Sequence, residues 1–130
     1  MPDQMPALKP HPDVLDFLAT RRSRPAKTLV LPVPDRAVVE QLLTIAARTP
    51  DHGKLEPWRF CVLEREACVR LGALTGRIGA AKGMDADKLD KASAQFANAH
   101  LCIAVIASPK PSEKIPELEQ TLSAGAVCQQ

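Results

Sequence analysis

Only two segments of this 130-residue chain have the composition of a β-strand, and this limits the folds open to it. Residues 58–63 form a short segment rich in apolar and aromatic side chains. Residues 101–107 (LCIAVIA) are apolar throughout, as expected of a strand that is covered on both faces. Helical patterns precede, separate and follow them. This alternation predicts an α+β domain (an α/β sandwich) in which helices pack around a small sheet. Two strands alone rarely make a stable sheet. We therefore expect that further strands or a partner chain complete it, or that its helices cover it well enough.

The helices are predicted from apolar spacing and from capping residues. The second is the clearest, because Asp35 can cap it and an apolar stripe follows at the spacing of a buried helix face. That stripe consists of Val38, Val39, Leu42, Leu43 and Ala46. The other predicted helices span Pro12 to about Arg22, residues 65–82 (weakened by three glycines), Asp85 or Asp87 to about Ala97, and a last one from about Glu117.

The chain has the length of one domain. Residues 1–11 hold three prolines and are expected to form an extended tail, which leaves residues 12–130 as the domain. The last helical pattern is apolar up to Val127 and carries no stop signal before Gln130. We therefore expect the domain to be incomplete at its C-terminus.

Composition restricts the function. The chain is 45% apolar but only 3% aromatic, and its net charge is +2. Few aromatic side chains and little charge argue against a module that binds single-stranded nucleic acid. Cysteines 61, 68, 102 and 128 lie in apolar segments without C-x-x-C spacing, which predicts buried, reduced thiols. No membrane-length apolar stretch or signal core is present, so we expect a cytoplasmic protein with no membrane partner.

The first candidate site is the basic triplet Arg21-Arg22-Ser23 at the end of the first helix. Guanidinium groups and a hydroxyl can bind a phosphate, and Arg24 and Lys27 add positive charge nearby. Adjacent helical arginines point about 100° apart, so one ligand rarely takes both. Cations at a helix C-terminus also complement its dipole, and Ser23 could simply cap a turn.

The second candidate is the loop after the second helix. Arg48 ends that helix, and His52 follows Pro50-Asp51 in a turn. Asp51 is expected to close an Asx turn, and Gly53 indicates a positive φ or a close approach to another surface. A loop histidine is more often solvated than functional. Trp58, after Pro57, is expected to enter the core.

Several common chemistries lack their sequence patterns. The chain has no phosphate-binding or dinucleotide-binding glycine motif and no hydrolase G-x-S-x-G motif. His11, His52 and His100 show no zinc-type spacing, so no metal site is predicted.

Taken together, three motifs resemble the FMN-dependent nitroreductase family, in its small NAD(P)H nitroreductase branch. They are R-R-S, a helix ending A-x-R-T-P-D-H, and x-P-W-R-F-x-V. The resemblance resumes at Lys114-Ile115-Pro116, runs through Ser123-Ala124-Gly125 and covers most of residues 13–130. Family members continue past this helix into strands and a segment that contacts the flavin, so the resemblance implies the N-terminal portion of a nitroreductase-like fold.

The resemblance also implies a function. It implies a homodimer with FMN at each subunit interface, where Arg21, Arg22 and Ser23 hold the phosphate and ribityl end. Arg48 and His52 would reach the same flavin from the other subunit. NAD(P)H would be the co-substrate, giving a hydride to flavin N5, and a nitroaromatic, quinone or similar small acceptor would then be reduced by a ping-pong mechanism. The chemistry is carried by the flavin, so no catalytic side chain is expected.

Two alternatives remain open from the residues. The chain could be a non-enzymatic remnant, or a dimerisation or interaction fragment without a complete flavin site. It could also be a small anion- or RNA-binding domain that uses Arg21, Arg22, Arg24 and Lys27, although the low aromatic content and small charge oppose this.

Overall fold

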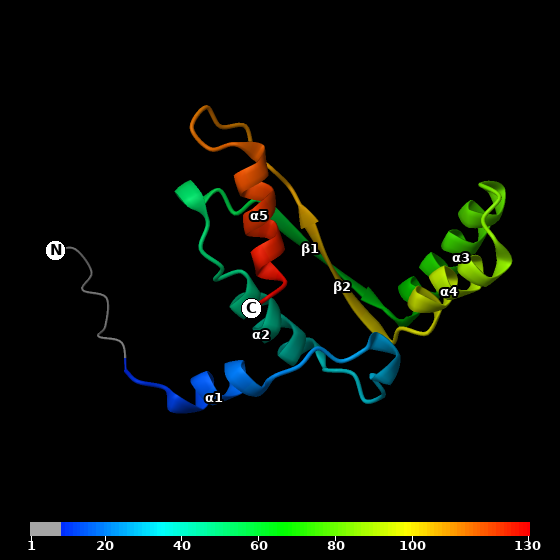
Figure 1. The fold of residues 1–130 in the computed structure, drawn as a ribbon, viewed down its shortest axis with the longest axis horizontal. Coiled ribbons are helices and arrows are strands. Elements are labelled where there is room, and N and C mark those ends of the chain that lie inside the picture. The colour runs from blue at the N-terminus through cyan, green and yellow to red at the C-terminus, as the bar shows by residue number, and fades with distance from the viewer. Residues whose placement is uncertain (1–8) are drawn as a thin grey trace.

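The computed structural model describes residues 9–130 (Figure 1). Most of the tail expected over residues 1–11 lies outside the described residues. The elements are α1 (Pro12–Thr20), a 3₁₀ turn (Ala26–Thr28), α2 (Arg36–Ala46), a second 3₁₀ turn (His52–Lys54), β1 (Trp58–Glu64), α3 (Arg65–Ala81), α4 (Ala86–Ala97), β2 (Leu101–Ala107) and α5 (Glu117–Val127). This α+β arrangement of helices around a small sheet confirms the predicted fold class.

The two strands form an antiparallel sheet. They pair along their whole length, from Trp58 opposite Ala107 to Glu64 opposite Leu101. Helices α3 and α4 form an antiparallel hairpin that joins the paired ends and projects beyond the sheet (Figure 1). One end of the sheet is therefore fixed by the hairpin, and the other carries the loops around residues 49–57 and 108–116.

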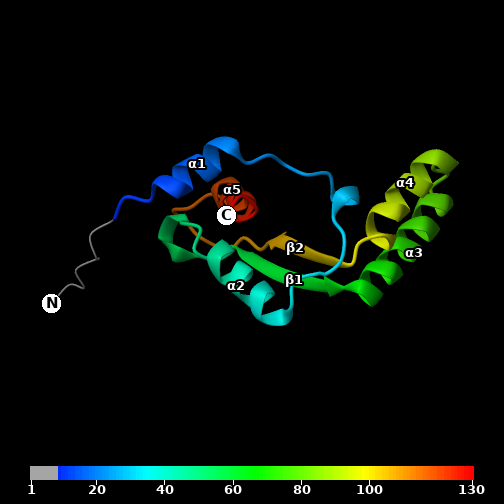
Figure 2. The same cartoon turned by 90° about the horizontal axis from the view of Figure 1, so that it is seen from below.

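The core is small and lies where α5 packs on the sheet (Figure 2). Trp58 is 8% exposed and packs with Ala124 and Val127 of α5, as predicted for the strand entrance. Half-buried side chains that complete this cluster are Ala46, Phe60 and Val105. A cluster of this size buries little of the apolar surface that the sequence supplies.

The expectation that residues 101–107 are covered on both faces is wrong. No residue of β2 is fully buried, and Ile106 and Ala107 are exposed. Among the described elements, α5 makes the main helix contact with this strand. The sheet therefore keeps open surface that the apolar sequence of β2 did not predict.

The glycines of α3 allow close helix packing. A Cβ added at Gly72 would lie 2.8 Å from the Cβ of Ala97 on α4, and Gly79 faces Leu89 in the same way. Ser93 of α4 donates its hydroxyl hydrogen to the carbonyl of Gly72 at 2.9 Å. The glycines that lower the helix propensity of α3 thus allow α4 to pack closely against it.

Residues 9–34, which we call the N-terminal arm, have no buried residue. Its apolar helix face is open, with Leu15 72% exposed. On α2 only Val39 is buried; Leu43 and Ala46 are half-buried, and Val38 and Leu42 are exposed. The predicted buried stripe of α2 is therefore wrong in extent, because little of this chain packs against that helix face.

The cysteine prediction is corrected in part. Cys68 is fully buried and Cys102 half-buried, but Cys61 and Cys128 are exposed, and all four are free thiols. Cys61 lies in β1, and Cys128 directly follows α5. Across residues 9–130, no helix combines the length and the apolar character needed to cross a bilayer.

Candidate functional site

The basic triplet follows α1 directly. The helix ends at Thr20, two residues before the expected end near Arg22, and Arg21 has extended backbone angles (φ −56°, ψ 147°). The backbone N–H of Arg21 donates to the carbonyl of Phe17 at 2.8 Å. The triplet is therefore the first extended segment after the helix, and its backbone and side chains are open to solvent.

The side chain of Arg22 folds back onto the end of α1. Its Nη1 donates to the carbonyls of Arg21 at 2.8 Å, Thr20 at 3.3 Å and Ala19 at 3.4 Å. The last carbonyls of a helix have no partner within it and carry its negative dipole end. Arg22 thus takes the helix-capping role foreseen for a cation here. Arg21 and Ser23 remain exposed beside it.

The loop that carries His52 is held by its neighbours. The carboxylate of Asp51 accepts the backbone N–H groups of Leu55 at 2.7 Å and Glu56 at 3.0 Å, a wider closure than the expected Asx turn. Gly53 has φ +74°, and a Cβ there would lie 2.6 Å from Cδ1 of Ile115. Both readings of Gly53, positive φ and close approach, are confirmed.

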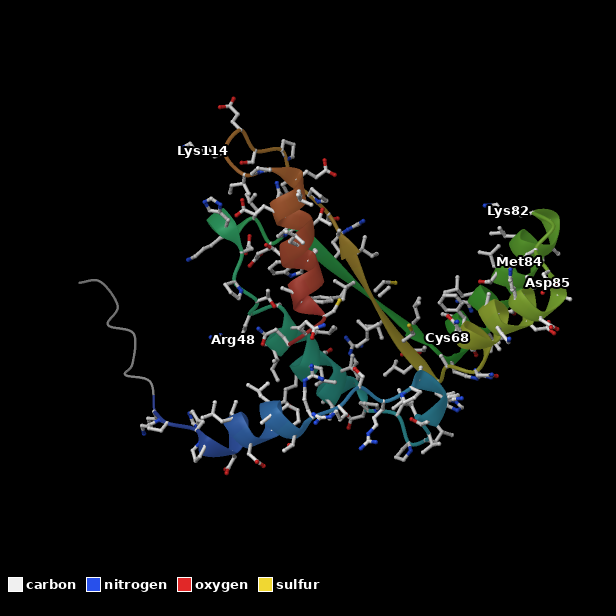
Figure 3. All side chains as sticks on the ribbon, in the orientation of Figure 1. Arg48, Cys68, Lys82, Met84, Asp85 and Lys114 are labelled. Carbon is white, nitrogen blue, oxygen red and sulfur yellow. The ribbon has the colours of Figure 1, made fainter. Side chains whose placement is uncertain are left out.

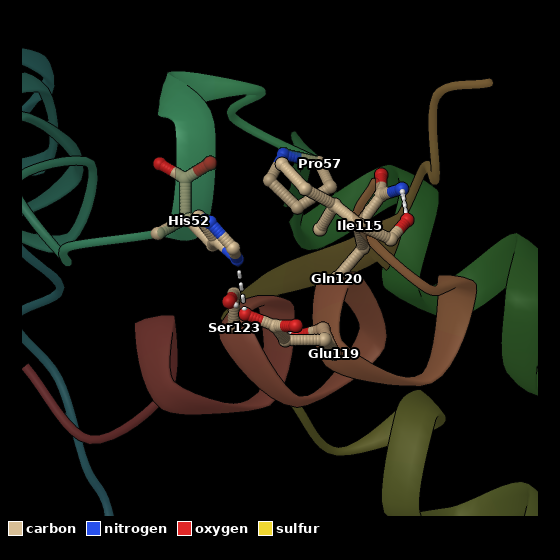
Figure 4. Close-up of a pocket in the computed structure, with 7 residues that line it drawn as sticks. His52, Pro57, Ile115, Glu119, Gln120 and Ser123 are labelled. Atoms are coloured by element: carbon tan, nitrogen blue, oxygen red, sulfur yellow. Dashed lines mark hydrogen bonds and ion pairs between the residues drawn. The ribbon is translucent and has the colours of Figure 1, made fainter. Parts of the chain in front are cut away.

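The imidazole of His52 points at α5. Its Nδ1 lies 2.8 Å from Oε1 of Glu119, and both side chains are about half exposed (Figure 4). The hydroxyl of Ser123 donates to the backbone carbonyl of Glu119 at 3.1 Å. Together with Pro57, Ile115 and Gln120 these residues line a hollow too shallow to hold a water molecule.

Arg48 follows α2 and is exposed, with its backbone N–H donating to the carbonyl of Ile45 at 3.0 Å. Figure 3 shows its side chain leaving the end of α2 on the side away from the α3–α4 hairpin. Arg48 and His52 are both exposed on the segment that joins α2 to β1.

The structure does not bring the two candidate groups together within one chain. The triplet follows α1, and the His52 turn lies well apart from it (Figure 1). A second hollow, a groove of about 350 Å³ along residues 109–120, also lacks Arg21 and Ser23. Within one chain, the triplet and the His52 turn are therefore two separate groups.

Glu119 was not predicted from the sequence. It stands 67 positions from His52 and lies in the first turn of α5. No spacing rule could have paired the two residues. The contact arises because the turn at His52–Lys54 packs near the start of α5, where a Cβ at Gly53 would meet Ile115.

The sequence model of the Nitroreductase family matches residues 18–130. "Putative NAD(P)H nitroreductase YdjA" of Escherichia coli K12 is 36% identical over 113 residues, and a "Putative NAD(P)H nitroreductase" of Haemophilus influenzae is 38% identical over 114. Each alignment covers 87% of this chain, which spans 61% of the length of either relative.

The fold has a counterpart among solved structures. The crystal structure of a nitroreductase-like family protein from Bacillus cereus superposes with a TM-score of 0.69 at 19% identity. The superposition covers 95% of this chain and 64% of that one. Sequence match and fold agree, and the chain belongs to the nitroreductase family.

Proposed function

We propose that this chain supplies one half of an FMN site in an NAD(P)H-dependent oxidoreductase that works as a homodimer in the cytoplasm. One observation carries the proposal: Arg21 and Ser23 stand exposed directly after α1, within an N-terminal arm that has no buried residue. The names of the two bacterial relatives support NAD(P)H as the reductant.

The residues fit the phosphate end of FMN. That phosphate carries close to two negative charges, and a hydrogen bond to a charged group contributes about 1.5–3 kcal/mol. The guanidinium of Arg21 and the hydroxyl of Ser23 are free to face it. Arg22 holds the end of α1 and would add its backbone N–H and its charge. Arg48 and His52 of a second chain would approach from the opposite side.

Bound FMN would supply the redox chemistry, taking a hydride from NAD(P)H and reducing a nitroaromatic, quinone or similar acceptor in a second half-reaction of a ping-pong cycle. The protein's part is to bind and orient. No side chain of the candidate site has to act as a nucleophile or a general base. That agrees with a surface that offers cations, a hydroxyl and an imidazole.

The test is FMN affinity, measured by the quenching of flavin fluorescence on titration with protein. Arg21→Ala should weaken binding about ten- to a hundredfold, the loss of one charged phosphate contact. Arg24→Ala removes the same charge three residues away and should change the affinity less than about threefold. Equal losses of FMN affinity in the two variants would show that Arg21 acts only through its positive charge and makes no specific contact with the phosphate. Protein that neither carries FMN nor binds added FMN would contradict the proposal.

A second candidate is a dimerisation or interaction fragment without flavin chemistry. It is favoured by large apolar side chains open on α5 as well as on the arm, with Leu118 and Leu122 among the most exposed. This candidate predicts a stable oligomer on gel filtration with no flavin absorbance, before and after incubation with FMN.

A further inference from the structure

The contact between His52 and Glu119 has a chemical direction. A carboxylate only accepts hydrogen bonds, so the contact at 2.8 Å requires a hydrogen on Nδ1 of the imidazole. In the neutral ring this fixes the Nδ1–H tautomer and leaves Nε2 as an acceptor. In the protonated ring Nε2 carries the second hydrogen. Either way, Nε2 is the ring nitrogen left for a ligand.

The backbone around His52 is already fixed without this contact. Asp51 closes the loop through the N–H groups of Leu55 and Glu56, and Gly53 rests against Ile115. Rotation about the side-chain bonds of His52 is the freedom that remains. Glu119 is the acceptor that can restrict it: Figure 4 shows the ring turned toward the carboxylate of Glu119.

We propose that Glu119 is the positioning residue for His52: its Oε1 accepts the hydrogen of Nδ1 and holds the ring on α5, so that Nε2 is presented to the flavin. This role rests on the proposed FMN site. Glu119 itself touches no ligand in this scheme. Its contribution is orientation and the choice of tautomer, as in the acceptors that orient functional histidines in other proteins.

The ring can be observed directly, without FMN. Long-range ¹H–¹⁵N correlation spectra of the neutral imidazoles report which nitrogen carries the hydrogen. The chain has three histidines, so His52→Gln assigns the signal. Wild-type His52 should show Nδ1–H. Glu119→Gln should keep it because the amide oxygen can accept, and Glu119→Ala should move it toward Nε2–H. Wild-type Nε2–H, or a Glu119→Ala spectrum identical to wild type, would overturn the proposal.

Glu117→Ala is the matched control. Glu117 also lies in the first turn of α5, so its loss removes the same charge from the helix N-terminus and leaves His52 untouched. Its spectrum should match that of the wild type. A shift of the His52 signal in this variant as large as in Glu119→Ala would assign the effect to the helix and overturn the proposal.

FMN titration separates this inference from the proposed function. Glu119→Ala should weaken binding about two- to fivefold, the range of an exposed pair, and Glu119→Gln and Glu117→Ala less than about twofold. If all variants bind FMN alike, Glu119 does not position His52 for the flavin. If wild type binds none, the FMN site fails, and the spectra still decide whether Glu119 sets the tautomer.

Discussion

Gly53 holds the His52 loop in a conformation that a larger residue would strain. Its φ is +74°, and an added Cβ would meet Ile115. Gly53→Ala should therefore lower the free energy of unfolding by about 1–3 kcal/mol, measured by urea denaturation. Gly76→Ala is the control, because Gly76 lies in α3 and a Cβ added there would lie 3.8 Å from the hydroxyl of Ser93, an ordinary contact distance. That change should be neutral or stabilising by up to about 1 kcal/mol. Equal effects at both positions would contradict the strain at Gly53.

Cys68 gives the fold a pH dependence. Burial raises the pKa of its thiol, and the nearby Cys102 adds to the effect. The folded chain thus holds this proton more tightly than the unfolded chain. The stabilisation is complete below the unfolded pKa of about 8.5 and is lost as the pH rises through the folded value. Urea denaturation at pH 7 and pH 10 should show a larger fall in stability for wild type than for Cys68→Ala. An equal fall in stability in wild type and in Cys68→Ala would show that Cys68 is not the source of the pH dependence.

At the scale of elements, packing and helix propensity have opposite effects in the α3–α4 hairpin. Propensity alone predicts that Gly72→Ala stabilises α3 by about 1 kcal/mol. The added methyl group, however, would meet backbone atoms of Ala97 at 2.9–3.0 Å, and backbone moves less readily than a side-chain end. We expect a net destabilisation of about 1–3 kcal/mol, seen as a lower thermal midpoint by circular dichroism. A raised midpoint would contradict this, because it would show that the two helices can move apart to accommodate the methyl group with little loss of free energy.

The elements were largely predictable because their signals are local. Asp35 caps α2 by accepting the N–H of Val38, and Asp85 caps α4, as their sequence positions indicated. The strand Leu101–Ala107 has the predicted bounds. The end of α1 lies two residues earlier than predicted, because Arg21 already takes extended backbone angles, and Arg22 turns its side chain back onto the last carbonyls.

At the scale of the whole molecule, the open arm predicts self-association. Leu15 of α1 contacts little of its own chain, so Leu15→Asp should leave the circular dichroism spectrum and the thermal midpoint nearly unchanged. If the arm covers a second copy, the same change should turn a dimer into a monomer in analytical ultracentrifugation. Asp16→Ala on the same helix should leave the dimer intact. A dimer that persists in Leu15→Asp would exclude this face of the arm from the contact.

Burial and the site could not be predicted to the same degree. Apolar spacing shows which helix face avoids water but not which chain covers it, and Val38 and Leu42 are therefore exposed despite their pattern. The residues of the basic triplet and of the His52 loop were named from motifs. The pairing of His52 with Glu119 depends on tertiary proximity, which a local pattern does not encode.

The hairpin between the strands also shapes the order in which the chain can fold. Strand pairing across residues 65–100 would require closure of a long flexible loop, which is entropically unfavourable. A helical hairpin forms from nearby contacts and brings Glu64 and Leu101 together. The guanidinium of Arg65 donates to the carbonyls of Ala97 and Ala99 at that junction. Pairing would then proceed from this end toward Trp58, so the end of the sheet next to the His52 loop would be the last to assemble.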